Sequence, residues 1–193
     1  MLNWLEDNDQ MANTLVVYMG DNGFSFGEHG LIDKRHMYEE SMRVPLLMHC
    51  PAVIKPGTIL EQVVQNVNIA PTVLAYSGLP TPSQMQGNSF LSLLRGQTTG
   101  TQVVRHSDRP WRNQAFYEYY REVKFPQTPT MFGVRTDRYE YIFNHGVWDA
   151  NELYDLQANP LEVNNLIRSA EHQSIAKTMQ GQVFDWLEQT GGL

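Results

Sequence analysis

Apolar residues in the first half of the chain fall into short runs, separated by glycine, proline and acidic or amide residues. Two of these runs, 14–19 and 44–49, are rich in branched and aromatic side chains and predict buried strands. The other runs predict helical segments over 2–12 (the end of a helix), 36–42, 68–77 and 87–95, and a strand pair or extended segment over 59–67. This mixture of short strands and helices is typical of an α/β protein.

The second half of the chain has a different pattern. Tight turns separate short, aromatic-rich runs that predict a small antiparallel sheet, with strands over 114–120, 131–136, 139–143 and 152–156. Asn159-Pro160 is predicted to start a helical stretch, and helical spacing over 169–189 predicts a terminal helix. A polar segment, 98–112, separates the two patterns. We therefore predict two domains, 1–105 and 106–193.

Composition narrows the class of protein. With 193 residues, 41% of them hydrophobic, the chain is long enough to bury a core. The net charge of -7 argues against a nucleic-acid partner, and no apolar run approaches the length of a membrane span. Cys50 is the only cysteine, which excludes an intrachain disulfide. Because it ends an apolar run, we interpret it as a buried, inert thiol rather than a nucleophile.

The first candidate for chemistry is the loop Gly20-Asp21-Asn22-Gly23, which follows the strand predicted over 14–19. In open α/β sheets, functional loops collect past the carboxyl ends of strands. Asp21 and Asn22 offer a carboxylate and an amide oxygen, the hard donors that Ca²⁺ and Mg²⁺ prefer. Asn-Gly is also a common turn signal, so a plain turn is the alternative.

Further motifs follow this loop in order. Gly27-Glu28-His29-Gly30 precedes the string DKRHMYEES at 33–41, and Arg43-Val44-Pro45-Leu46 comes after it. Later motifs are NIAPTVL at 68–74, GVRTDRY at 133–139 and ELYDL at 152–156. Together with the Asp-Asn loop, these motifs resemble the sulfatases of the alkaline-phosphatase superfamily over nearly the whole chain. The Asp-Lys-Arg-x-x-Tyr-Glu string is most similar to enzymes acting on sulfated sugars, such as N-acetylglucosamine-6-sulfatases, and to arylsulfatase-type enzymes.

The resemblance implies roles for three residues of the candidate site. Asp21 and Asn22 are similar to two of the family's Ca²⁺ ligands, so calcium is expected in preference to magnesium. Lys34 is similar to the lysine that pairs with sulfate; outside this motif it would be interpreted as a solvated charge. A sulfate monoester is an anion whose hydrolysis needs cationic stabilisation of the sulfuryl oxygens and a proton for the leaving alcohol.

Other side chains are candidates for substrate contact. His29 and His36 are predicted to act with Lys34 in catalysis, because an imidazole exchanges protons near neutral pH. Either one can equally be a loop histidine with satisfied hydrogen bonds. Arg35 is a candidate for binding a second anionic group, with an exposed ion pair as the alternative. Tyr119 lies on an aromatic strand that can stack on a sugar ring, and the alternative there is simple packing.

The family's nucleophile has no counterpart in this sequence. Sulfatases mature a cysteine or serine to formylglycine in a C/S-x-P-S/A-R motif, which Cys50-Pro51-Ala52-Val53 does not fit. The family's paired amino-terminal metal-binding aspartates are absent too. The chain therefore resembles the carboxyl-terminal part of a sulfatase, inactive alone, with formylglycine expected in a missing amino-terminal part. The implied fold is part of an alkaline-phosphatase-like α/β sandwich sheet with flanking helices, plus a small antiparallel sheet and a carboxyl-terminal helix.

The predicted function is hydrolysis of sulfate monoesters, with a sulfated sugar or an aryl sulfate as substrate. One alternative is a phosphodiesterase or phosphonate-type hydrolase of the same superfamily, and another is a non-catalytic module that binds sulfated glycans. A truncated sheet would expose a strand edge and apolar surface, which predicts association with the missing part or self-association. The resemblance implies a periplasmic, secreted or lysosomal enzyme, although no residue indicates the compartment.

Overall fold

The computed structural model describes residues 1–96, 111–146 and 150–192. Contacts divide the chain into two compact units. Unit 1 comprises Met1–Asp21 and Pro45–Arg112, and unit 2 comprises Asn22–Val44 and Asn113–Leu193. The domain boundary predicted at 105/106 lies outside the described residues. The first segment of unit 2 carries the candidate site residues from Asn22 to Arg35, which the sequence had assigned to the first domain.

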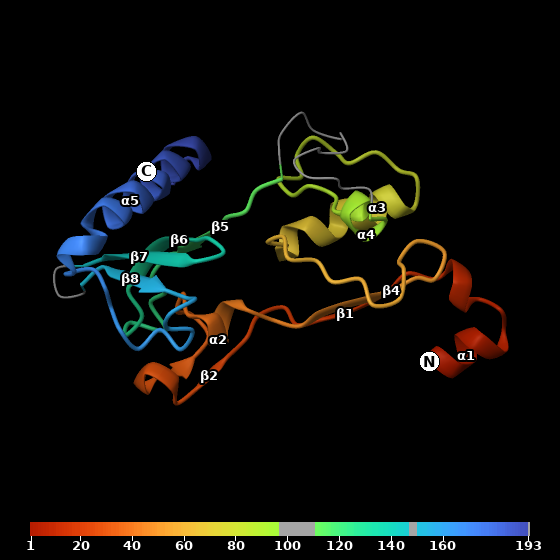
Figure 1. Ribbon diagram of the computed structural model, residues 1–193, viewed down its shortest axis with the longest axis horizontal. Coiled ribbons are helices and arrows are strands. Elements are labelled where there is room, and N and C mark those ends of the chain that lie inside the picture. Colours follow the sequence, from red (N-terminus) through yellow and green to blue (C-terminus); the bar gives the residue numbers. More distant parts are fainter. Residues whose placement is uncertain (97–110, 147–149, 193) are drawn as a thin grey trace. The chain divides into compact units, whose positions relative to one another are not determined.

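Unit 1 contains a pair of short strands. The strands β1 (Val16–Met19) and β4 (Leu46–His49) run antiparallel, with Tyr18 opposite Leu47. The helical elements of this unit are α1 (Leu2–Asp7), η1 (Met11–Asn13), η3 (Asn66–Asn68), α3 (Ile69–Tyr76) and α4 (Leu91–Leu94) (Figure 1). The predicted strands and helices are thus present with shorter ends, where fraying and capping make boundaries least certain.

Of the two alternatives predicted over 59–67, a strand pair or an extended segment, the strand pair is wrong, because residues 59–65 form no strand. Their backbone groups find other partners: the Trp111 indole donates to the Val63 carbonyl at 3.1 Å. At the end of the segment, the Gln65 amide donates to the Asn68 side chain at 2.8 Å as part of a capping box on η3. Because side chains form hydrogen bonds with these backbone groups, the segment does not need a strand partner to satisfy them.

The core of unit 1 forms around α4. Phe90, Leu91, Leu93 and Leu94 are buried and are packed by apolar side chains of β4 and α3. Cys50 is fully buried at the end of β4, with its sulfur 3.4 Å from the Tyr76 hydroxyl. A buried thiol in such surroundings packs as a small apolar group.

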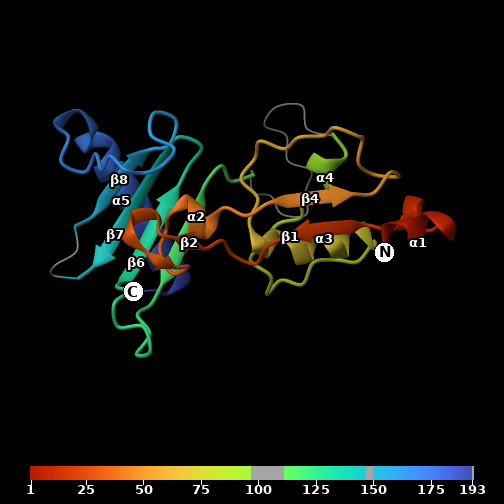
Figure 2. The same ribbon diagram turned by 90° about the horizontal axis from the view of Figure 1, so that it is seen from below.

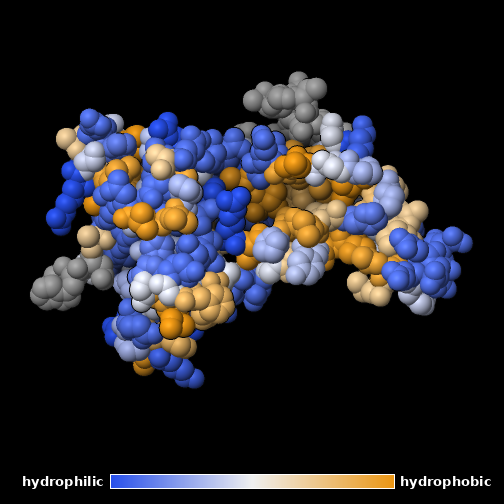
Figure 3. Space-filling model, turned by 60° about the horizontal axis from the view of Figure 1, so that its bottom comes forward, coloured by the Kyte–Doolittle hydropathy of each residue, from blue (hydrophilic) through white to orange (hydrophobic). Residues whose placement is uncertain are grey.

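Unit 1 also exposes apolar side chains. Tyr18 and Leu47 lie opposite each other on one face of the β1–β4 pair, and they are 65% and 64% exposed. Figure 3 shows further apolar side chains gathered on this unit, where the exposed residues include Ile59, Val67, Val73, Leu79 and Met85. Exposed patches of this kind mark interaction surfaces.

Unit 2 is built on a four-stranded antiparallel sheet, as the aromatic-rich runs predict. Its strands follow chain order: β5 (Ala115–Tyr119), β6 (Thr130–Arg135), β7 (Tyr139–His145) and β8 (Glu152–Asp155). A second, two-residue pairing joins β2 (Ser25–Phe26) to β3 (Ile32–Asp33), with η2 (Glu28–Gly30) between them. The remaining helical elements are α2 (Glu39–Met42), η4 (Ala170–His172) and α5 (Gln173–Thr190).

The two faces of this sheet are covered differently. On one face, Phe132, Val134, Tyr141 and Leu153 pack against Ala176, Met179, Val183 and Leu187 of α5. On the other face, Met131, Ile142 and Tyr154 pack against Met37, just before α2. Figures 1 and 2 show α5 and α2 on opposite sides of the sheet. Because side chains alternate along each strand, α5 packs on one face of the sheet and the segment around α2 packs on the opposite face.

The helical stretch predicted from Asn159-Pro160 is wrong, because residues 157–168 form turns and irregular backbone. The Asp155 carboxylate accepts from the Gln157 and Ala158 amides, which closes a turn directly after β8. Glu162 then adopts a left-handed φ of 49°, which a helix does not accommodate. None of the described helices is long and apolar enough to cross a membrane.

Candidate functional site

The Asp-Asn loop is held by side-chain and backbone hydrogen bonds. In unit 1, the side-chain amide of Asn66 donates to the backbone carbonyl of Asp21 at 2.6 Å. In unit 2, the side-chain amide of Asn22 donates to the Gly23 carbonyl at 2.7 Å. The backbone N–H of Gly23 donates to the Ser41 carbonyl at 2.8 Å. The last contact fixes the loop against α2.

Gly23 is required by a close approach of two backbones. A Cβ at this position would overlap the carbonyl group of Glu40. The close neighbour of Gly23 is therefore the backbone of α2.

We expect Gly23→Ala to destabilise the protein by roughly 1–3 kcal/mol, because the alanine must push α2 away from the loop. Gly181→Ala is the matched control, since nothing lies within 4 Å of its added Cβ and the residue belongs to α5. That control should stabilise by roughly 0.4–1 kcal/mol. Urea denaturation of both variants measures the difference, and equal midpoints would contradict the predicted overlap.

Lys34 and Asn22 are brought together although 12 residues separate them. The Lys34 ammonium donates to the Asn22 Oδ1 at 2.9 Å, and the Lys34 side chain is exposed. The Lys34 amide also donates to the Asp33 carboxylate at 2.6 Å. A cation accessible to solvent therefore lies beside the amide oxygen predicted to bind a metal.

Arg35 and Tyr119, the other predicted substrate contacts, meet at a residue that sequence reasoning missed. The Arg35 Nε lies 3.4 Å from the Glu122 Oε1, and the Tyr119 hydroxyl donates to the same oxygen at 3.0 Å. Arg35 also pairs with Asp33 at 2.6 Å and lies over the Phe125 ring, with its Cζ 3.3 Å from the ring centre. The Arg35 ion pairs are partly buried, with 19% of its side chain exposed.

Both candidate histidines lie near the ring of Tyr38. The His29 ring stacks on the Tyr38 ring with centroids 3.9 Å apart, and its Nε2 lies 3.5 Å from the Glu40 Oε2. The His36 ring is 6.2 Å from the Tyr38 ring. Burial lowers the pKa of His36, and the carboxylates of Asp33 and Glu152 oppose this shift.

The hydroxyl groups of Tyr38 and Tyr154 converge on the carboxylate of Glu152. Tyr38 donates to Glu152 at 2.9 Å, and Tyr154 donates to the same oxygen. Burial raises the pKa of both phenols, and the Glu152 charge raises it further. Both tyrosines therefore remain hydrogen-bond donors throughout the neutral range.

A buried set of carboxyl groups lies on the same face of the sheet. Arg135 pairs with Glu39 through two contacts of 2.6 and 3.3 Å. The Glu162 carboxylate accepts from the Glu39 amide at 2.9 Å. Burial raises the pKa of Glu140 well above its usual range, and the neighbouring Glu162 carboxyl raises it further. Sequence reasoning missed these residues because their partners are far apart in the chain.

The donor chemistry of Asp21 and Asn22 fits calcium. A carboxylate oxygen and an amide oxygen are hard ligands, and the loop offers no imidazole or thiolate that would favour zinc. Calcium takes 6–8 oxygen ligands, so a complete site would need further oxygens besides these two. The positively charged Lys34, in contact with Asn22, suits an anionic ligand such as a sulfate ester.

The family model for the carboxyl-terminal region of N-sulphoglucosamine sulphohydrolase matches residues 27–189. The chain therefore belongs to the sulfatase family, and it corresponds to a carboxyl-terminal portion, as its motifs predict. Its α/β architecture, with small antiparallel sheets and a carboxyl-terminal helix, is that of the alkaline-phosphatase-like sulfatases.

Individual relatives agree with this assignment. The chain is 35% identical to the N-acetylglucosamine-6-O-sulfatase of Bacteroides thetaiotaomicron over 98% of its length and 32% of that protein's. It is similar, with 36% identity and a TM-score of 0.85, to a solved protein in complex with its substrate, D-glucosamine-2-N,6-O-disulfate, covering 97% of this chain and 37% of the other. The chain thus spans about a third of the length of these relatives.

A phosphonate monoester hydrolase of Agrobacterium radiobacter shares the fold. Its TM-score is 0.78 over 97% of this chain and 37% of the other, with 22% identity. At this identity the likeness concerns the fold alone.

Proposed function

We propose that this chain supplies the calcium- and sulfate-binding residues for hydrolysis of a sulfate monoester on a sugar. Its membership of the sulfatase family supports the reaction class. The 35% identical relative is an N-acetylglucosamine-6-O-sulfatase. The solved protein with a TM-score of 0.85 has D-glucosamine-2-N,6-O-disulfate as its substrate. These two relatives support a sulfated amino sugar as the substrate class.

The observation that carries the proposal is the contact between Lys34 and Asn22. A cation 2.9 Å from an amide oxygen, in a loop that also offers the Asp21 carboxylate, joins the two kinds of group that sulfate binding requires. In the proposed site, Asp21 and Asn22 hold calcium, which when bound supplies positive charge at the sulfuryl oxygens. Lys34 pairs with a sulfate oxygen as a compact point charge.

The other candidates have proposed roles around this centre. Arg35 and Tyr119 are connected through Glu122 and are proposed to contact the sugar. His29 and His36 were both candidates for proton transfer to the leaving alcohol. His36 is half-buried with a lowered pKa, which favours the neutral form of its ring at neutral pH. The nucleophile, a formylglycine in this family, is proposed to come from a segment outside these 193 residues.

The test compares this chain with the same chain extended upstream in its own gene. Sulfate release would be measured with calcium present, on N-acetylglucosamine-6-sulfate, D-glucosamine-2-N,6-O-disulfate and an aryl sulfate. We expect release only by the extended form. If the 193-residue chain released sulfate as fast as the extended form, the proposal that the nucleophile lies outside these residues would be contradicted.

Two other outcomes would favour the alternatives. Hydrolysis of a phosphonate monoester but of no sulfate ester by the extended form would favour the phosphonate-type hydrolase, whose fold the chain shares. Binding of sulfated glycans without turnover in either form would favour a non-catalytic module.

A further inference from the structure

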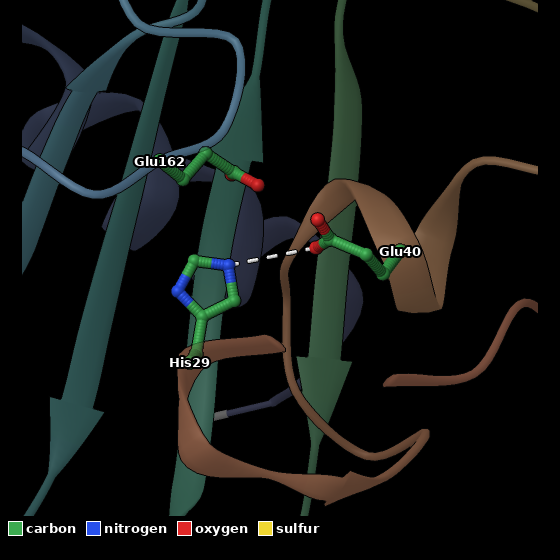
Figure 4. Close-up of side chains that lie close together, drawn as sticks. All are labelled: His29, Glu40 and Glu162. Carbon is green, nitrogen blue, oxygen red and sulfur yellow. Dashed lines mark ion pairs between the residues drawn. The ribbon is translucent and has the colours of Figure 1, made fainter. Parts of the chain in front are cut away.

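Three side chains from separate segments of unit 2 converge on one point. His29 comes from η2, Glu40 from α2 and Glu162 from the loop after β8 (Figure 4). One potential ligand atom from each lies within 4.8 Å of the others. The His29 Nε2 and the Glu40 Oε2 are 3.5 Å apart, which is longer than an ordinary hydrogen bond.

The carboxylates of this cluster have oxygens without hydrogen-bond partners among the described residues. Glu162 is 1% exposed; one of its oxygens accepts from the Glu39 amide, and the other has no partner. The buried Oε2 of Glu40 has none either. Figure 4 shows the Glu162 carboxylate directed toward the space between the His29 ring and Glu40. Buried carboxylate oxygens left in this way are costly unless a cation or a donor compensates them.

The Arg135 guanidinium, on which the Glu162 charge acts, is already committed to another carboxylate. Arg135 forms two contacts with Glu39 and does not satisfy the open oxygens of Glu40 and Glu162. Glu140, fully buried on the same face of the sheet, has a pKa raised by burial and by its side-chain interaction with Glu162, which favours its neutral form. The carboxyl groups of this cluster that are left to compensate are therefore those of Glu40 and Glu162.

We propose that His29, Glu40 and Glu162 form a binding site for a divalent transition metal, with zinc as the preferred ion. An imidazole nitrogen with two carboxylate oxygens is a donor set that suits zinc rather than calcium. Bond lengths of about 2.0–2.1 Å in a tetrahedral site place neighbouring ligand atoms about 3.3 Å apart, close to the separation of His29 and Glu40. A water molecule would complete the coordination.

The surroundings of the cluster favour such a site. Stacking on Tyr38 fixes the plane of the His29 ring, which orients a ligand before metal arrives. The His29 and Glu40 side chains keep 11% and 22% exposure, which leaves a route for the ion and its water. The metal would link η2, α2 and the loop after β8, and it is separate from the proposed calcium ligands Asp21 and Asn22.

The test measures metal binding without any assay of activity. The 193-residue chain, stripped of metal by a chelator and checked for its fold by circular dichroism, would be dialysed against zinc and analysed for bound ion. Cobalt titration would be followed through the visible bands of four-coordinate Co²⁺. We expect about one equivalent of zinc per chain, tetrahedral cobalt bands and a rise in the thermal midpoint on zinc addition.

Variants localise the site. We expect His29→Gln to weaken zinc binding by more than about 100-fold. That loss exceeds the roughly 10–100-fold typical when a residue that only supports a metal ligand is replaced. His172→Gln is the matched control, because that histidine also lies in a short helical turn of unit 2 but contacts Ser169 instead. Glu40→Gln provides a second ligand variant on a half-buried side chain. The proposal is overturned if the folded wild type binds no zinc, or if folded His29→Gln and Glu40→Gln bind it as the wild type does.

Discussion

Replacing Arg135 with methionine is expected to lower the free energy of unfolding by about 3–5 kcal/mol, because it leaves a charged partner without its counter-ion in a largely buried place. The partner is Glu39, whose side chain is 15% exposed and receives both contacts from the guanidinium. The charges of Glu140 and Glu162 also act on Arg135. Loss of the guanidinium would therefore leave several carboxyl groups close together, with only the exposed Arg43 still in contact with Glu39.

Arg43→Met tests whether burial is the reason. Arg43 contacts the same Glu39 carboxylate at 3.2 Å, but its side chain is 76% exposed. Exposed ion pairs contribute about 0–1 kcal/mol, so this variant should stay near the wild type. Urea denaturation of the two variants and of Glu39→Gln measures the contrast. Equal small losses for both arginine variants would show that Arg135 does not compensate a buried charge.

The fold of unit 2 could be predicted well from local pattern. The strands over 115–145 alternate between a face for α5 and a face for Met37, and α5 ends at Gly191 with a left-handed φ of 75°. The alternation along the strands and the glycine at the end of the helix are local patterns, although the partners that cover the two faces lie far away in the sequence. The stretch after Asn159 could not be predicted, because the left-handed backbone at Glu162 goes with a contact to Glu39, 123 residues away.

The candidate site could be predicted only in part for the same reason. Motifs predicted Lys34 and Asn22 as site residues, and the structure places the Lys34 ammonium 2.9 Å from the Asn22 Oδ1; their roles stay a prediction. No motif pointed to Glu122, whose contact with Arg35 spans 87 residues. Lone acidic residues have no periodicity, and their roles depend on partners that only the folded chain brings near.

Lys34→Ala is expected to reduce kcat for sulfate release by about 10²–10³-fold in the active, upstream-extended form of the chain, because it removes one cationic partner of the sulfuryl oxygens. The Lys34 side chain is exposed, so the free energy of unfolding should change by no more than about 0.5 kcal/mol. A loss of activity without a loss of stability therefore distinguishes a role in the reaction from a structural one.

The control is Lys177→Ala, which removes an exposed lysine from α5 and should leave both activity and stability unchanged. Lys34→Arg keeps the charge but not its compact shape, so we expect it to restore only part of the rate. Asn22→Ala should lower calcium affinity together with the rate, because it removes a proposed ligand of the ion. Full activity of Lys34→Ala would contradict the proposed pairing with sulfate. The contact between Lys34 and Asn22 would then hold the loop in place and take no part in the chemistry.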